Sequence, residues 1–89
     1  MIRKRYRFTG KVQHVGFRWH ARKAAEFFGC TGWCRNNPDG SVTMELQGSR
    51  AKTGLVILSL RTESRIRIDH TDVTVLPLIP DEQEFRSEY

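Results

Sequence analysis

Arg18 is the residue of this sequence with the clearest potential for chemistry, because it directly follows a glycine-bearing segment, residues 10–17. The alanine spacing after it predicts a helix that begins at Arg18, with Arg18 on or beside the stripe that faces the core. A helix start already presents positive charge through its unpaired backbone N–H groups and its dipole. A guanidinium at this position therefore needs an anion beside it.

Two kinds of anion can satisfy Arg18. One is a carboxylate of the protein itself, in a buried or half-buried ion pair. The other is a bound oxyanion, held jointly by loop N–H groups, the helix start and the planar, bidentate guanidinium. The glycine-bearing segment immediately before Arg18 favours the bound oxyanion. The sequence thus predicts an anion site at this point of the chain.

Other reactive residue types lack suitable partners. Cys30 and Cys34 form an isolated C-x-x-x-C pair, so a zinc site would have to recruit His14 and His20 and is the less favoured interpretation. We expect two buried, reduced thiols, no metal and no other cofactor. The sequence has no G-x-x-x-x-G-K-[ST] or H-E-x-x-H motif, and no paired carboxylates near the loop. A serine or cysteine nucleophile has no evident base.

The strand that leads into the loop is predicted over residues 2–9. Tyr6 and Phe8 alternate there with basic residues, which is the two-residue period of a half-buried strand. Lys4 interrupts the apolar side, so we expect the strand to fray at its beginning. The basic side is expected to be a solvated face, made of Arg3, Arg5 and Arg7.

The helix that Arg18 opens is predicted over residues 18–28 and is expected to stop at Gly29. Trp19 and His20 are interpreted as helix surface. The core-facing positions, spaced three and four apart, are Ala21, Ala24, Ala25 and Phe28.

Two strands, residues 31–37 and 41–47, are predicted around the turn signal Pro38-Asp39-Gly40. Trp33, on the first of them, is expected either to line the site or to pack within the sheet.

A second helix is predicted over residues 50–61, with a core stripe made of Ala51, Leu55 and Leu58. An irregular stretch, residues 63–67, follows it. The remaining strands are predicted over residues 72–76 and 84–89.

The order β-α-β-β-α-β predicts an α+β fold of the ferredoxin-like type, a sandwich with an antiparallel sheet and two helices on one face. We expect a single domain over residues 1–89. Because this arrangement hosts many functions, the function has to be inferred from the site.

The chain is basic, with 15 Lys and Arg against 10 Asp and Glu, a net charge of +5 and a pI near 9.8. This balance attracts anions of every kind and does not choose among nucleic acid, lipid and phosphorylated metabolites. No apolar run has the length of a membrane span, and the basic start lacks the apolar stretch of a signal peptide. We therefore expect a cytoplasmic protein that binds no membrane.

Two segments carry a family resemblance. Residues 10–18, G-K-V-Q-H-V-G-F-R, resemble the acylphosphatase signature G-x-V-Q-G-V-x-F-R, and residues 32–36, G-W-C-R-N, resemble the second signature, G-W-V-x-N. The D-G-S-V turn at residues 39–42 and the spacing between the signatures also match. The similarity continues more weakly to Tyr89 and so covers the whole chain.

The resemblance implies hydrolysis of acyl phosphates to carboxylate and inorganic phosphate, without metal and without an enzyme-bound intermediate. It implies that loop amides and the Arg18 guanidinium hold the phosphoryl group, while the Asn36 side chain holds the attacking water. Arg18 and Asn36 would be the catalytic residues. The phosphate-binding residues would be Gln13, His14, Val15, Gly16, Phe17 and Arg18. The expected partners are a small acyl phosphate and inorganic phosphate, as product and inhibitor, with no nucleic acid, and the protein is expected to be a monomer.

His14 departs from the family pattern, which usually has glycine at this position of the loop. If the backbone there requires a positive φ, histidine brings a strain that glycine avoids. Its imidazole could instead donate a hydrogen bond to the substrate. Cys34 in place of the commoner valine is a mild apolar exchange.

Two other functions are compatible with the predicted fold. An RNA-binding module of the RRM type would carry aromatic residues on the central strands, but residues 42–47 have none, and Tyr6 and Phe8 are expected to face the core. An acylphosphatase-like module that only binds an acyl phosphate, like those at the N-terminus of hydrogenase-maturation proteins, is the second alternative. The presence of both Arg18 and Asn36 favours hydrolysis.

Overall fold

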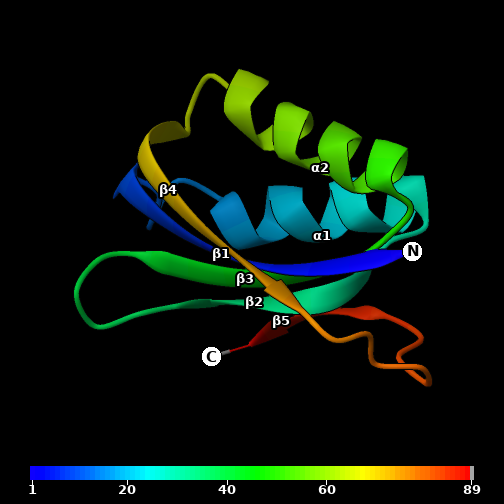
Figure 1. The fold of residues 1–89 in the computed structure, drawn as a ribbon. Helices are drawn as coiled ribbons and strands as arrows, with labels where there is room; N and C mark the ends of the chain where they lie inside the picture. Colours follow the sequence, from blue (N-terminus) through cyan, green and yellow to red (C-terminus); the bar gives the residue numbers. More distant parts are fainter. Residues whose placement is uncertain (89) are drawn as a thin grey trace.

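A five-stranded sheet carries both helices on one of its faces (Figure 1). The computed structural model describes residues 1–88, and the predicted strand position Tyr89 lies outside them. The sheet has the strand order β4-β1-β3-β2-β5. The elements are β1 Ile2–Lys11, α1 Phe17–Phe28, β2 Thr31–Asn36, β3 Val42–Gly48, α2 Arg50–Thr62, β4 Arg67–Leu76 and β5 Phe85–Glu88.

This order confirms the predicted ferredoxin-like arrangement and corrects one feature of the sheet. The neighbouring strands are antiparallel except for β2 and β5, which run parallel with Gly32 opposite Phe85. The reason is the path of residues 77–84, which leave β4 at one edge and cross to the other edge of the sheet (Figure 1). The sheet is therefore mixed.

The core lies between the helices and the sheet, as the alternation in β1 predicts. Tyr6 and Phe8 are buried, and the Phe8 ring lies 5.2 Å from that of Phe17, the first residue of α1. The helix stops at Gly29, whose backbone is left-handed with φ 70°. The alanines predicted for the core side of α1 are buried, and so are the two free thiols: Ala21, Ala24, Ala25, Cys30 and Cys34.

The prediction of a solvated basic face on β1 is wrong at Arg3, whose residue is only 1% exposed. Its Nε donates to Glu45 Oε1 at 3.0 Å, and its Nη1 donates to Glu82 Oε1 at 2.7 Å. Burial alone would lower the pKa of Arg3, but these hydrogen bonds to carboxylates outweigh it and raise the pKa. Residues 77–84, which bring Glu82, cover this end of the open face, so β1 does not fray.

The predicted core stripe of α2 is also wrong. Leu55 and Leu58 are exposed, whereas the buried positions are Thr53, Val56 and Leu60. Both faces of this helix carry aliphatic residues, so the pattern does not distinguish them. The buried threonine hydroxyl is satisfied because it donates to Ser49 O at 2.9 Å.

β4 begins five residues before its predicted start, at Arg67 instead of position 72. It is an edge strand with no fully buried residue, so the alternation that marks half-buried strands is absent from its first half. Within the described residues, no helix combines the length and apolar character that a membrane crossing needs.

Candidate active site

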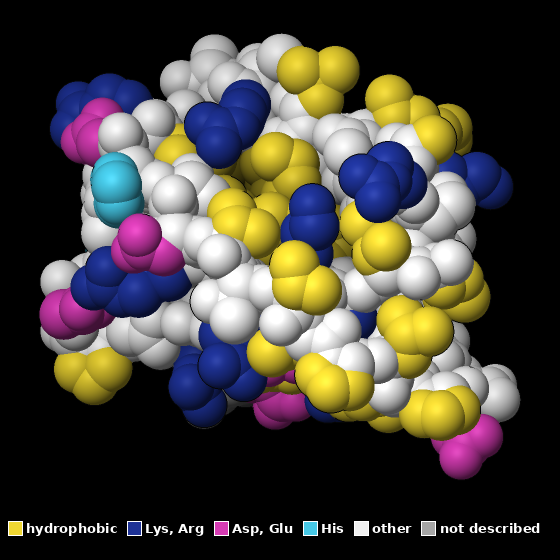
Figure 2. Space-filling view, viewed as in Figure 1, with side chains coloured by type: hydrophobic (Ala, Val, Ile, Leu, Met, Phe, Trp, Pro, Cys, Tyr) yellow, Lys and Arg dark blue, Asp and Glu magenta, His cyan; other side chains and the backbone are white. Residues whose placement is uncertain are grey.

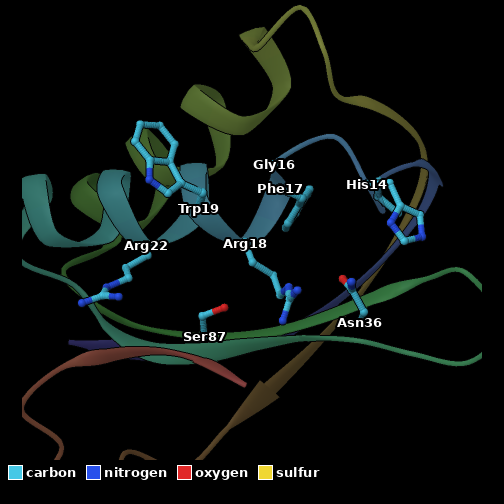
Figure 3. A pocket seen from close by; sticks show the side chains of 9 residues that line it. His14, Gly16, Phe17, Arg18, Trp19, Arg22, Asn36 and Ser87 are labelled. Carbon is cyan, nitrogen blue, oxygen red and sulfur yellow. The ribbon is translucent and has the colours of Figure 1, made fainter. Parts of the chain in front are cut away.

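A pocket of about 360 Å³ opens where β1 ends, α1 begins, and β2 and β5 lie alongside (Figure 3). The Arg18 side chain extends from α1 toward the sheet, with Asn36 on one side of it and Ser87 on the other (Figure 3). The residues lining the pocket are Val12, His14, Gly16, Phe17, Arg18, Trp19, Arg22, Asn36 and Ser87.

The loop between β1 and α1 turns into the helix through two residues with positive φ. His14 has φ 62°, and among the described residues it is the one non-glycine with such a value. Gly16, with φ 79°, is the N-cap of α1 and has no side chain to satisfy the first helical N–H groups. No acidic residue lies in the first turn of the helix. These backbone donors therefore add to the positive potential of the pocket.

Arg18 is positioned by both the helix and the last strand. It is the second residue of α1, and its Nη1 donates to the backbone oxygen of Glu88, in β5, at 2.9 Å. Cys34 lies fully buried beneath the site, where burial raises the pKa of its thiol to about 12, against a smaller lowering by Arg18. A thiolate nucleophile at Cys34 is thus unfavourable near neutral pH.

The Gln13 side chain joins the loop to the β2–β3 hairpin. Its Nε2 donates to the backbone oxygens of Asn37 and Ser41, both at 2.8 Å. The amide is used in these two bonds, so the side chain of Gln13 acts as a brace between the two segments that form the pocket. The backbone of Gln13 is part of the loop that was predicted to bind phosphate.

Asn36 is the last residue of β2 and is paired in register with Val42 of β3. The turn that follows is held by its own hydrogen bonds, because Asn37 Nδ2 donates to Ser41 Oγ at 2.9 Å and to Thr43 Oγ1 at 2.7 Å. The hydroxyl and amide of Ser41, together with the Arg7 guanidinium, lower the pKa of the Asp39 carboxyl. These bonds fix the strand end from which Asn36 points into the pocket.

The structure brings most of the predicted site residues to one pocket: His14, Gly16, Phe17, Arg18 and Asn36. Two are absent from its lining. Gln13 is turned toward the hairpin, and Val15 packs partly buried against the core and lines the neighbouring groove. Trp33 lies outside the pocket, with the Arg35 guanidinium 5.3 Å from its ring centre. The roles of these residues remain predictions.

Four lining residues were not predicted for the site. Val12, directly before the predicted loop residues, is one of them. Arg22 follows Arg18 by four residues, one helical turn, and this spacing is a signal that the sequence does contain. Trp19 was interpreted as helix surface, and it is 61% exposed while also lining the rim. Ser87 comes from β5, and no local pattern marks it.

The electrostatics of the pocket suit an anion. Among residues 1–88, its lining includes two arginines and a histidine and no Asp or Glu. Figure 2 shows Lys and Arg side chains spread over one face of the molecule, and the chain has 15 of them against 10 Asp and Glu. In the same part of the chain, no three His, Cys, Asp or Glu side chains gather as metal ligands would.

Known proteins resemble this chain both in sequence and in fold. The family model described as acylphosphatase matches residues 4–87. An acylphosphatase of Lactobacillus johnsonii is 38% identical over 73 residues, which are 80% of each chain. The crystal structure of acylphosphatase from Bacillus subtilis superposes with a TM-score of 0.91 at 23% identity, covering 100% of both chains, and so shares the fold. A full-length HypF structure in a phosphate- and nucleotide-bound form has a TM-score of 0.84 at 23% identity, and the match covers 100% of this chain and 12% of HypF.

The fold is a βαββαβ arrangement extended by β5, and a pocket lined by two arginines and a histidine opens at the start of its first helix. The chain belongs to the acylphosphatase family. It is accordingly a hydrolase whose substrates are small acyl phosphates.

Proposed function

We propose that hydrolysis of acyl phosphates takes place in the pocket at the start of α1, with Arg18 and Asn36 as the catalytic residues. The observation that carries the proposal is that Arg18, the loop with its positive-φ residues and Asn36 all open to this one pocket. The wider claims that residues 1–89 act as one domain, as a monomer and in the cytoplasm belong to the same proposal.

The loop and Arg18 form the phosphate site in this proposal. Backbone N–H groups of residues 13–18 and the guanidinium donate to the phosphoryl oxygens, and the helix dipole adds to the attraction. Charge that develops on these oxygens in the transition state is stabilised by donors that are already in place. Inorganic phosphate, which presents the same oxygens, is then a competitive product inhibitor.

Asn36 orients the water in this proposal. The water oxygen attacks phosphorus, a new P–O bond forms, and the bond between phosphorus and the acyl oxygen breaks. The electron pair of that bond leaves with the carboxylate, and the water proton passes to the released phosphate or to solvent. Because a carboxylate is a good leaving group, no strong general acid is needed, and positioning together with charge neutralisation supplies the catalysis.

Release of phosphate from benzoyl phosphate, measured with and without EDTA, tests this proposal. We expect hydrolysis at the same rate in both conditions, because the proposed machinery contains no metal. A loss of activity with EDTA that a divalent ion restores would contradict the mechanism. Absence of hydrolysis in both conditions would favour a module that binds an acyl phosphate without cleaving it.

A further inference from the structure

A second groove of about 580 Å³ lies next to the pocket, between the loop and the residues that precede and begin β4. We call it the basic groove. It shares His14 and Gly16 with the pocket, so the two spaces border the same part of the loop. The residues lining it are Lys11, His14, Val15, Gly16, Ser64, Arg65 and Arg67.

Two cations of the basic groove lie opposite each other on neighbouring strands. Lys11, at the end of β1, is the register partner of Arg67, at the beginning of β4. Residues directly opposite each other lie on the same face of a sheet, and like charges there are destabilising. Arg65 adds a third cation two residues before Arg67, and no Asp or Glu lines the groove within residues 1–88.

Protein carboxylates compensate this charge only in part. Arg67 Nε lies 3.0 Å from Asp69 Oδ1, in a pair with both side chains more than half exposed, which contributes little stability. Among the described residues, neither the Lys11 ammonium nor the Arg65 guanidinium is in an ion pair. The groove therefore contains positive charge that the carboxylates of the described residues do not neutralise, and this charge can attract an anion.

Gly10 allows the close approach of β1 and β4 that brings Lys11 and Arg67 side by side. The β1–β4 register shifts between Thr9 and Gly10, and the glycine has φ 126°. A Cβ at this position would lie 2.2 Å from the backbone oxygen of Arg67, so only glycine allows the approach. On the other side, Ile66 is buried and its N–H donates to Glu63 O at 3.1 Å, which anchors the turn that carries Arg65.

We propose that the basic groove binds a second anionic group on the acyl half of the substrate, so that the preferred substrates are acyl phosphates with an additional negative charge. This inference rests on the proposed function, because the phosphoryl group must occupy the neighbouring pocket. With that group held by the loop and Arg18, an acyl chain that passes His14 and Gly16 brings its far end to Lys11 and Arg65.

Three substrates of similar shape test the proposal. Benzoyl phosphate has a neutral acyl half, 4-carboxybenzoyl phosphate adds a carboxylate, and 4-(methoxycarbonyl)benzoyl phosphate is a neutral control for size. The readout is the ratio of kcat/KM between the carboxylate and the ester substrate, each corrected for its uncatalysed rate. Two exposed charge contacts predict a ratio of about ten for the wild type.

Arg65→Gln and Lys11→Gln should each lower this ratio severalfold. The matched control is Arg50→Gln, which removes the same charge from an exposed position at the start of α2. The groove residues Ser64 and Arg65 follow the other end of this helix, about 18 Å away along its axis. The control should keep the ratio, whereas an equal drop in Arg50→Gln would show general attraction by the net charge and overturn the proposal. A wild-type ratio near one, or a ratio unaffected by both groove variants, would overturn it as well. If none of the three substrates is hydrolysed, the proposed function itself fails.

Discussion

Arg3 and Arg18 are two arginines of the same small protein in opposite situations. Arg3 lies on the face of the sheet away from the helices and is enclosed by the carboxylates of Glu45 and Glu82. Arg18 lies at the start of α1, donates to a backbone oxygen of β5 and opens onto a pocket without acidic lining in the described part of the chain. The comparison teaches that the surroundings of a guanidinium suggest its role: carboxylates of the protein enclose Arg3, whereas Arg18 faces the pocket that we propose binds phosphate.

Arg18→Lys should have the largest effect. Lysine keeps the charge and loses the planar fork, so we expect kcat/KM for benzoyl phosphate to fall by a hundred- to thousandfold, in the range of about 3–4 kcal/mol. Inhibition by inorganic phosphate should weaken in parallel. Steady-state kinetics with phosphate as inhibitor measure both. Near-native activity would remove Arg18 from the phosphate site.

Arg3→Met should destabilise the fold by about 3 kcal/mol, because it leaves Glu82 buried without its cation and leaves Glu45 with only the half-exposed Arg5. The matched control is Arg5→Met, since Arg5 also pairs with Glu45 but its side chain is 50% exposed, and its loss should cost less than about 1 kcal/mol. Urea unfolding measures both values. Activity per folded molecule should be retained in both variants. A selective loss of kcat in Arg3→Met would contradict the claim that Arg3 only stabilises the fold.

Asn36→Ala separates orientation of the water from binding of the phosphate. We expect kcat to fall on the order of a hundredfold, because a misplaced water loses its orientation advantage. The inhibition constant of phosphate should stay close to normal, since Arg18 and the loop remain. The melting temperature should change little, because the neighbouring turn is held by Asn37 and Gln13. Equal losses of rate and affinity would instead make Asn36 a phosphate-binding residue.

His14→Gly should have the smallest effect. The φ of 62° is unfavourable for histidine by about 1 kcal/mol, and glycine removes that cost while making the unfolded chain more flexible. We therefore expect unchanged or slightly higher stability, and activity on benzoyl phosphate that is kept or raised. Thermal melting and kcat on the same preparation test this. A large drop in kcat would show that the imidazole takes part in the reaction.

The sequence was sufficient for the features that depend on local patterns. The alternation in β1, the alanine spacing of α1 and the Pro38–Gly40 turn each appear in the structure as expected. The arginine at a helix start, with the two linked signatures, indicated five of the residues that line the pocket: His14, Gly16, Phe17, Arg18 and Asn36.

Features that depend on distant segments could not be read in the same way. Arg3 looks like a surface residue until residues 77–84 fold over it, and Ser87 reaches the pocket only because β5 adds to the far edge of the sheet. The rotation of α2 depends on packing against α1 and β3, since aliphatic residues occupy both of its faces. Long-range packing decided each of these cases.

Titration of the isotope-labelled protein with inorganic phosphate, followed by NMR, tests the central claim most directly. The account predicts that the backbone amides of residues 13–18 shift in one saturable process, with a dissociation constant equal to the inhibition constant measured in the hydrolysis assay. In Arg18→Lys the same titration should need a much higher phosphate concentration. If phosphate inhibited hydrolysis while these amides stayed unmoved and signals elsewhere in the chain shifted, the site described at the start of α1 would be wrong.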